Sequence, residues 1–287
     1  MPIGIRPGLT RKVSVTISGV FLSMLSGTRA EASAAVPSPE RAALRRCEVY
    51  RKSFPMTEIV LPAHALRNRV IAKWVRDHRL AVEVRTGGDL AIAIAAGIHP
   101  SRITVHADGM SDSDLRTAVH FEFGFIAVSS IAQIEVLARS VDRGRQGVVL
   151  RVTDVNAPSP MTTGGGFPFD SGDLDRAVAA ILAGKRFNLI GLHCDVGSQD
   201  HDFVSYPAAI GHMITEMTQI RRHHDLVLTS LGLGGGRAVP SGNWAVELPE
   251  LAMQIEESLD DACATLRFPR PLVLLSPGLA IVDENSA

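Results

Sequence analysis

Short runs of aliphatic and β-branched residues alternate with amphipathic stretches from about residue 58 to residue 275. Several of these runs contain almost no polar residue, which is typical of parallel strands that helices cover on the outside. Between consecutive runs the chain has room for a helix with one apolar face. The sequence therefore predicts eight strands, at residues 58–63, 81–86, 103–107, 126–130, 147–152, 189–195, 226–231 and 271–275.

Capping residues mark helix boundaries between these runs. Ser111 with Asp114, and Ser130 with Gln133, have the spacing of a capping box, in which each side chain accepts a hydrogen bond from the other residue's amide. Gly97 follows an apolar stretch and is expected to end a helix in the left-handed conformation. We therefore expect helices to begin just after Ser111 and Ser130 and another to end just before Gly97.

Eight strand-then-helix units in a chain of 287 residues favour a closed barrel over an open sheet. We predict an α/β fold, a (β/α)8 barrel of the TIM type in residues 37–287, preceded by a poorly ordered N-terminal extension, residues 1–36. Barrels of this kind build their active sites at the carboxyl ends of the strands. The longest predicted loop, residues 156–172, lies at that end and contains three consecutive glycines.

Charge and cysteine content exclude several classes of protein. The formal net charge of −1 gives no sign of binding to nucleic acid or to an anionic membrane. Cys47, Cys194 and Cys263 are far apart and odd in number, which argues against a disulfide framework and predicts a reducing, cytoplasmic location. No apolar run is long enough for a membrane span. Residues 11–32 loosely resemble a signal peptide, but polar residues interrupt the apolar stretch, so an extension is favoured.

A run of glycines, Gly234–Gly236, follows the seventh predicted strand. Consecutive glycines let backbone amides approach a phosphate closely, and the late loops of a barrel often hold one. The same glycines could instead serve only a tight turn. The pattern therefore indicates a candidate phosphate site without settling it.

Titratable side chains gather at the predicted strand ends. Strand alternation places His193 and Asp195 on one face and Cys194 on the other. Together with His64, these side chains could act as acid and base, or around a metal ion. In the simpler interpretation, His193 is a hydrogen-bonded core residue; we predict no metal site.

Five segments are similar, in order and rough spacing, to motifs of the diaminopimelate/ornithine/arginine decarboxylase family. Residues 83–97 (EVRTGGDLAIAIAAG) resemble that family's DVxSGGELxxALxAG, and residues 192–199 (LHCDVGSQ) resemble LHCHIGSQ. The segments at residues 106–115, 231–236 and 276–282 resemble HGNNKSxxEL, LDLGGG and EPGRAIV. The resemblance implies an alanine-racemase-like barrel, pyridoxal phosphate as cofactor, and a place in lysine biosynthesis.

The resemblance also assigns site residues. It implies that the cofactor would contact Gly197, Ser198, Gly234, Gly235, Gly236, Asp195 and Ser276. The glycines and Ser198 match the part of the family's motifs that holds the phosphate.

Four positions depart from the family's pattern. His64, in LPAHA, stands where a lysine of the pattern YAxKA forms the Schiff base, and imidazole cannot form that bond. Asp195 replaces a histidine that stacks on the cofactor ring, and Ser276 replaces the glutamate that pairs with the pyridine nitrogen. Leu279 replaces an arginine near the phosphate. The family's further β-domain has no counterpart in residues 37–287, so we expect a complete decarboxylase site to need another chain.

Three hypotheses follow. The first is a decarboxylase-like barrel, catalytically impaired, that binds phosphate or pyridoxal phosphate weakly and without a covalent bond. The second is a barrel enzyme of different chemistry that uses His64, His193 and Asp195, with or without a metal. The third is a structural partner without a ligand. We expect a small phosphate or amino-acid-like ligand, and either a homodimer or a heteromer with a full-length relative.

Overall fold

The eight predicted strands are present and parallel. The computed structural model describes residues 39–141, 145–153, 165–184, 186–196, 205–234 and 244–281. The predicted boundary between residues 36 and 37 lies outside this part and stays a prediction. The strands that match the predicted runs are β1 (Thr57–Pro62), β2 (Ala81–Val84), β3 (Ile103–His106), β4 (Phe125–Val128), β5 (Gln146–Thr153), β7 (Phe187–Asp195), β8 (Ser230–Gly234) and β9 (Leu272–Leu275).

These strands close into a barrel. The order around the sheet is β4-β3-β2-β1-β9-β8-β7-β5, and the pairing of β4 with β5 closes the ring. All of the pairings are parallel, so the carboxyl ends of the strands meet at one mouth. A two-residue strand that the sequence did not predict, β6 (Phe167–Pro168), adds to β5 within the long loop. The predicted TIM-type barrel is confirmed.

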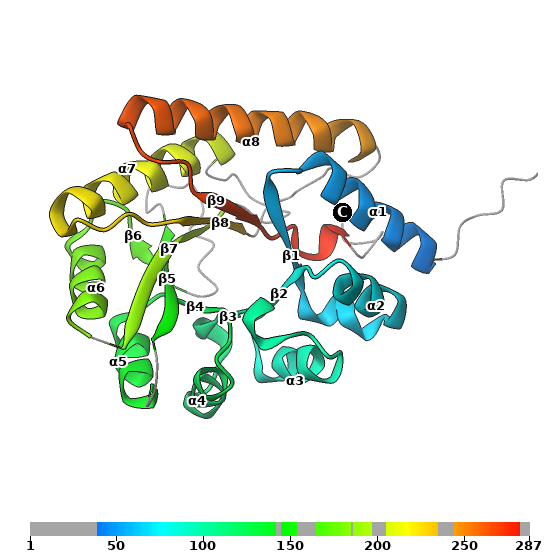
Figure 1. Ribbon diagram of the computed structural model, residues 1–287, viewed down its shortest axis with the longest axis horizontal. Coiled ribbons are helices and arrows are strands. Elements are labelled where there is room, and N and C mark those ends of the chain that lie inside the picture. Colours follow the sequence, from blue (N-terminus) through cyan, green and yellow to red (C-terminus); the bar gives the residue numbers. More distant parts are fainter. Residues whose placement is uncertain are drawn as a thin grey trace, which may run out of the picture. The chain divides into compact units, whose positions relative to one another are not determined.

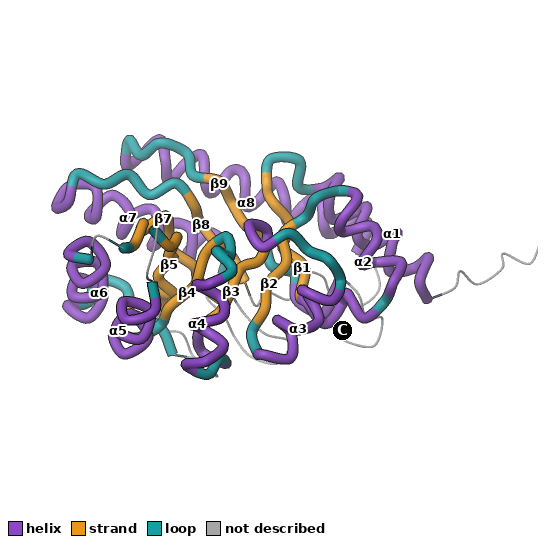
Figure 2. Tube along the Cα trace, turned by 60° about the horizontal axis from the view of Figure 1, so that its bottom comes forward, coloured by secondary structure: helices purple, strands orange, loops and turns teal. Residues whose placement is uncertain are grey.

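Helices surround the barrel on the outside, as Figures 1 and 2 show. Apart from α1, which precedes β1, each lies between two strands in the chain, because its apolar face needs the outer surface of the sheet for burial. Their bounds are α1 (Pro39–Ser53), α2 (Arg69–Asp77), α3 (Gly87–Ala95), α4 (Asp112–His120), α5 (Ile131–Ser140), α6 (Gly172–Ala183), α7 (Tyr206–His224) and α8 (Trp244–Leu266).

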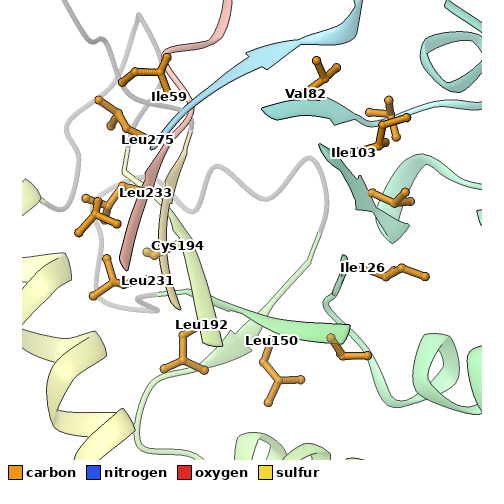
Figure 3. Packing of buried hydrophobic residues seen from close by; sticks show 14 of the residues in the cluster. Ile59, Val82, Ile103, Ile126, Leu150, Leu192, Cys194, Leu231, Leu233 and Leu275 are labelled. Atoms are coloured by element: carbon orange, nitrogen blue, oxygen red, sulfur yellow. The ribbon is translucent and has the colours of Figure 1, made fainter. Parts of the chain in front are cut away.

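Aliphatic side chains on the outer face of the strands form the main core. Residues at alternate positions of neighbouring strands, such as Ile126, Leu150 and Leu192, are fully buried against the helices (Figure 3). Cys194 belongs to this outer set, as its alternation with His193 and Asp195 predicts. Every second strand residue therefore points inward and is left to build the barrel interior.

The predicted helix boundaries are largely confirmed. Ser111 and Asp114 form a complete capping box, and Gly97 follows α3 with a positive φ of 70°. At α5, Ser130 accepts the amide of Gln133 as predicted, but the Gln133 side chain accepts from the amide of Ser129 instead of Ser130. The Gln133 side chain also donates to a carboxylate beyond the helix, and this second bond directs it away from the Ser130 amide.

The predicted strand at residues 226–231 is wrong in its bounds. Residues 226–229 are not in a strand, and β8 runs instead from Ser230 to Gly234. Asp225 ends α7 in the left-handed conformation, so the apolar residues after it first pack against the core before the chain enters the sheet. Gly234 is therefore the last residue of a strand, and only Gly235 and Gly236 of the glycine run follow it.

Candidate functional site at the barrel mouth

The inward-facing residues form two layers. Toward the amino ends of the strands, Val60, Ala81 and Leu274 make a small apolar cluster with Phe125 packed against it. Further along the strands, the inward positions become polar, with Glu83 on β2 and Arg151 on β5. The apolar layer closes the bottom of the barrel, and the polar layer faces the mouth where barrel enzymes carry out chemistry.

Arg151 is the centre of the polar layer. Its guanidinium donates one hydrogen bond to Asp108, after β3, and another to Asp195, at the end of β7. Only 8% of the Arg151 side chain is exposed. A planar guanidinium with several donors in a fixed fork is suited to joining two carboxylates in this way. Arg151 therefore ties β5 to its neighbour β7 and to β3, which lies one strand further around the barrel.

A second arginine extends the same network. The Arg85 guanidinium lies 3.4 Å from the Glu83 carboxylate and 3.6 Å from Asp195. Asp195 thus contacts two arginines. The pKa of Asp195 lies well below its usual range: burial alone would raise it, but the hydrogen bond from His193 and the charges of Arg151 and Arg85 outweigh that effect.

Two histidines complete the layer. The ring of His193 lies 4.9 Å from that of His106, in an edge-to-face arrangement. Nε2 of His193 is 3.2 Å from Asp195, and Nε2 of His106 is 3.3 Å from Glu83. Burial lowers the pKa of His106 to about 4, so its ring is neutral near pH 7 and Nε2 donates to Glu83. Burial acts to raise the pKa of Glu83, but Arg85 and His106 lower it to about 2.

Asp108 is held by a separate set of donors. The hydroxyl of Ser129 donates a hydrogen bond to Asp108. The side-chain nitrogen Nε2 of Gln133 lies 3.2 Å from the same carboxylate oxygen and also donates to it. With Arg151 on its other oxygen, Asp108 has partners from β5, from the end of β4 and from α5. These bonds fix the orientation of the carboxylate.

Glycines on β8 make room for this polar layer. A Cβ atom on Gly232 would lie 2.4 Å from Nδ1 of His193, and one on Gly234 would lie 2.6 Å from the Asp195 carboxylate. No side chain fits at either position without displacing these groups. Gly232 and Gly234 therefore make room for His193 and Asp195.

The structure brings several predicted site residues together. His193, Asp195 and Gly234 are in contact, and Ser276 follows β9 with its amide bonded to the carbonyl of Leu233 at the end of β8. His64 lies in a short 3-10 segment (Ala63–Arg67) directly after β1, and its buried Nε2 has no hydrogen-bond partner in the part of the chain described. Gly197, Ser198, Gly235 and Gly236 lie outside the described residues, so their roles stay predictions.

The site residues assigned from the sequence did not include the two arginines or Glu83. Arg151 is an isolated charge within the apolar run VVLRVT, and that isolation is the available signal, because a lone arginine in a buried strand needs carboxylate partners. Glu83 and Arg85 lie two residues apart, at β2 and just after it, and so share the inward face. That spacing is the signal that could have linked them to His106 and Asp195.

The described residues do not fit a covalently bound pyridoxal phosphate. A Schiff base needs a primary amine at the mouth. Lys52 lies in the last turn of α1, before β1 begins, and Lys73 lies on the outside of α2, where it pairs with Asp77. Within the same described ranges, no group of three histidine, cysteine or acidic side chains could hold a metal ion. Among the described residues, the mouth instead contains ion pairs that join Arg151 and Arg85 to Asp108, Asp195 and Glu83.

Comparison with known proteins places this barrel among its relatives. A diaminopimelate decarboxylase of Actinosynnema pretiosum subsp. auranticum is 31% identical over 247 residues, covering 83% of this chain and 55% of the relative. The crystal structure of a diaminopimelate decarboxylase from M. jannaschi matches with a TM-score of 0.72 at 17% identity, over 85% of this chain and 60% of that one. The structure of SrLDC in complex with PLP and cadaverine matches with a TM-score of 0.70 at 19% identity. This match covers 84% of this chain and 59% of the SrLDC chain.

The matches cover only part of each relative, which limits what they show about this chain. The chain spans about half the length of the curated relative, and the structural likenesses show the fold alone. The family model described as "Pyridoxal-dependent decarboxylase, pyridoxal binding domain" matches residues 41–283, which is most of the chain. The protein therefore belongs to the pyridoxal-dependent decarboxylase family, and its barrel is that family's pyridoxal binding domain.

Proposed function

We propose that this barrel binds phosphate or pyridoxal phosphate weakly, without a covalent bond, and is catalytically impaired on its own. The observation that carries the proposal is His64, which follows β1 where the family's pattern has the Schiff-base lysine. Imidazole has no primary amine to condense with an aldehyde. Neither Lys52 nor Lys73, the lysines of the described residues, is at the carboxyl ends of the strands.

The ion pairs of the mouth support the same proposal. Asp195 occupies the place of the family's stacking histidine, and Arg151 and Arg85 both bind it. An acidic side chain held between two arginines is not available to stack on a ring. Ser276, where the family's pattern has a glutamate, brings no negative charge to a pyridine nitrogen. Pyridoxal phosphate supplies an electron sink when bound, and that chemistry needs both the amine and the acid.

Retention of weak affinity rests on the phosphate end. Gly197, Ser198 and Gly234–Gly236 keep the family's motif, and backbone amides exposed by glycines bind phosphate without any lysine. We therefore expect affinity for the phosphate group to outlast the loss of the covalent bond. A small amino-acid-like ligand would then have no cofactor aldehyde positioned to react with it.

An absorbance titration with pyridoxal phosphate, before and after borohydride, tests the proposal. We expect a saturable signal of the free aldehyde, and no adduct fixed at the mouth after reduction. The matched variant His64→Lys should give a borohydride-fixed adduct that peptide mapping assigns to residue 64, if the aldehyde is held about 3 Å from the new amine. A fixed adduct on the unmodified chain at another residue of the mouth would contradict the proposal.

A second variant tests the phosphate end. Gly235→Val should abolish the binding of pyridoxal phosphate and leave the fold intact, because a side chain there blocks the approach of the amides. Unchanged affinity would show that the glycines serve only the turn. Complete absence of binding by the unmodified chain would favour a structural partner without a ligand.

One observation favours a different enzyme chemistry as the second candidate. The His193–Asp195 pair, with Nε2 3.2 Å from the carboxylate, has the geometry of a positioned general base. The same carboxylate is already bound by two arginines, and the described residues contain no three-ligand metal cluster. Metal in the purified protein, with loss of metal on His193→Gln, would select this candidate.

We propose that this chain works as a homodimer or in a heteromer with a full-length relative. The chain spans about half the length of its curated relative. Among the helices of the described residues, none is long and apolar enough to cross a membrane.

A further inference from the structure

A separate cavity lies at the opposite end of the barrel from the mouth. It has a volume of about 1020 Å³ and is lined by the end of α1, the start of β1 and the turn between α2 and β2. This volume is at the upper end of the range for small-molecule sites. The strands begin here and end at the mouth, so residues of this cavity take no part in the ion network around Arg151.

Basic side chains from separate elements line this cavity. Arg51 and Lys52 come from the last turn of α1, Arg79 follows α2, and Arg102 precedes β3. Arg102 lies 3.4 Å from the Glu58 carboxylate, whereas Arg51, Lys52 and Arg79 form no ion pair in the part of the chain described. The lining therefore carries more positive than negative charge, in a protein whose net charge is −1.

Interaction with a helix dipole explains the presence of only some of these basic residues. Arg51 and Lys52 complement the negative end of the α1 dipole, as cations in a last turn commonly do. The charges of Arg79 and Arg102 reach the same cavity from two other parts of the chain, far from α1 in sequence. Convergence of cations on one concave surface is the arrangement that binds an anion.

The lining of the cavity also includes apolar side chains and one hydroxyl group. Phe54, Ile59 and Leu80 line it as apolar side chains. Thr57 also lines it, and its buried hydroxyl has no hydrogen-bond partner among the described residues. A buried hydroxyl without a partner is costly unless a ligand or water satisfies it. The cavity thus offers apolar contact, one free hydroxyl and a positive rim.

We propose that this cavity, at the amino ends of the strands, binds a small phosphorylated molecule with an apolar or aromatic body. The phosphates bind Arg51, Lys52 and Arg79 at the rim, and the body of the ligand packs on Phe54 and Leu80. The site is separate from the mouth and does not depend on the proposed binding of pyridoxal phosphate there.

Arg79 can be replaced without destabilising the fold, so a change in ligand binding by the variant can be attributed to the lost charge. Its φ of 54° is in the left-handed region, where glycine is favoured, so Arg79→Gly removes the charge and relieves the backbone. Arg267 follows α8 with a φ of 51° and the same kind of backbone bond to the residue three positions earlier. Arg267 does not line the cavity, so Arg267→Gly is the matched control.

The probes are ATP, pyrophosphate and adenosine, titrated calorimetrically into the full chain at physiological salt. We expect ATP to bind saturably, pyrophosphate more weakly, and adenosine not at all. Arg79→Gly should weaken ATP binding by about fivefold or more, since a charge-assisted hydrogen bond to phosphate is lost. Arg267→Gly should leave it unchanged.

Three outcomes would overturn the proposal. These are no ATP binding by the unmodified protein at millimolar concentration, unchanged affinity in Arg79→Gly, or equal losses in the two glycine variants. The second would also result if ATP bound only at the mouth. Gly235→Val distinguishes the two sites, because it should abolish binding of pyridoxal phosphate while ATP binding at this cavity persists.

Discussion

Arg151 is the single residue on which the polar layer depends most, since it joins Asp108 and Asp195 inside the barrel. Replacing it leaves two half-buried carboxylates facing each other without that cation. A buried ion pair adds little net stability compared with apolar residues, but removal of one partner is strongly destabilising. The network therefore adds little to the stability of the barrel. Its main effect is that few single substitutions within it are tolerated.

Arg151→Met should lower the free energy of unfolding by about 3 kcal/mol, because the Asp108 carboxylate, which is largely shielded from water, loses the arginine that pairs with it. Lys73→Met, which breaks the exposed pair with Asp77 on α2, is the control and should change it by less than about 1 kcal/mol. Urea unfolding followed by circular dichroism measures both. Equal effects would show that the Arg151 bonds are of no greater consequence than a surface pair.

Acid should destabilise the barrel in two steps. The pKa of His106 is lowered to about 4 in the fold, so the unfolded chain binds more protons below its ordinary value of 6.5 and stability falls between those two limits. The pKa of Glu83 is lowered from 4.5 to about 2, so its contribution is lost as the pH falls through that lower range.

The urea midpoint measured between pH 7 and pH 4 checks the first step. It should fall steadily in the unmodified protein and much less in His106→Gln, which removes the titrating ring. A midpoint independent of pH over this interval would contradict the assignment of a neutral, buried His106.

At the scale of elements, β8 shows how the site constrains a strand. Its glycines leave room for side chains of the neighbouring β7, so the two strands are matched in shape. An apolar run followed by glycines predicts a strand and then a turn. The structure instead continues the strand through Gly234, because His193 and Asp195 occupy the space that β8 side chains would fill.

Gly232→Ala should lower the free energy of unfolding by about 2 kcal/mol, since the added methyl would lie 2.4 Å from the His193 ring. Gly211→Ala is the control: Gly211 lies within α7 with open space around its Cβ position, so alanine should raise stability by about 0.5–1 kcal/mol. Thermal unfolding of the two variants measures the difference. Stabilisation by alanine at both positions would mean that His193 is not packed against β8.

At the scale of the whole molecule, the fold could be predicted from sequence and the interior of the site could not. Hydrophobic periodicity indicated all eight barrel strands, because outer strand residues such as Leu150 and Leu192 must be aliphatic to pack on helices, but it placed the start of β8 four residues too early. The pairing of Arg151 with Asp108 and Asp195 joins residues 43 and 44 positions apart, and only closure of the barrel brings them together. The two-residue β6 is too short for any periodic signal.

We propose that this member of the pyridoxal-dependent decarboxylase family is catalytically impaired on its own. Carbon dioxide release from meso-diaminopimelate, measured with purified protein and added pyridoxal phosphate, tests it most directly. We predict no release above that of a protein-free control, because the described residues place no amine at the mouth and Asp195 is held by Arg151 and Arg85. Robust turnover by the unmodified chain would contradict this account. Because residue 64 is a histidine, such turnover would require a lysine from elsewhere in the chain to reach the cofactor.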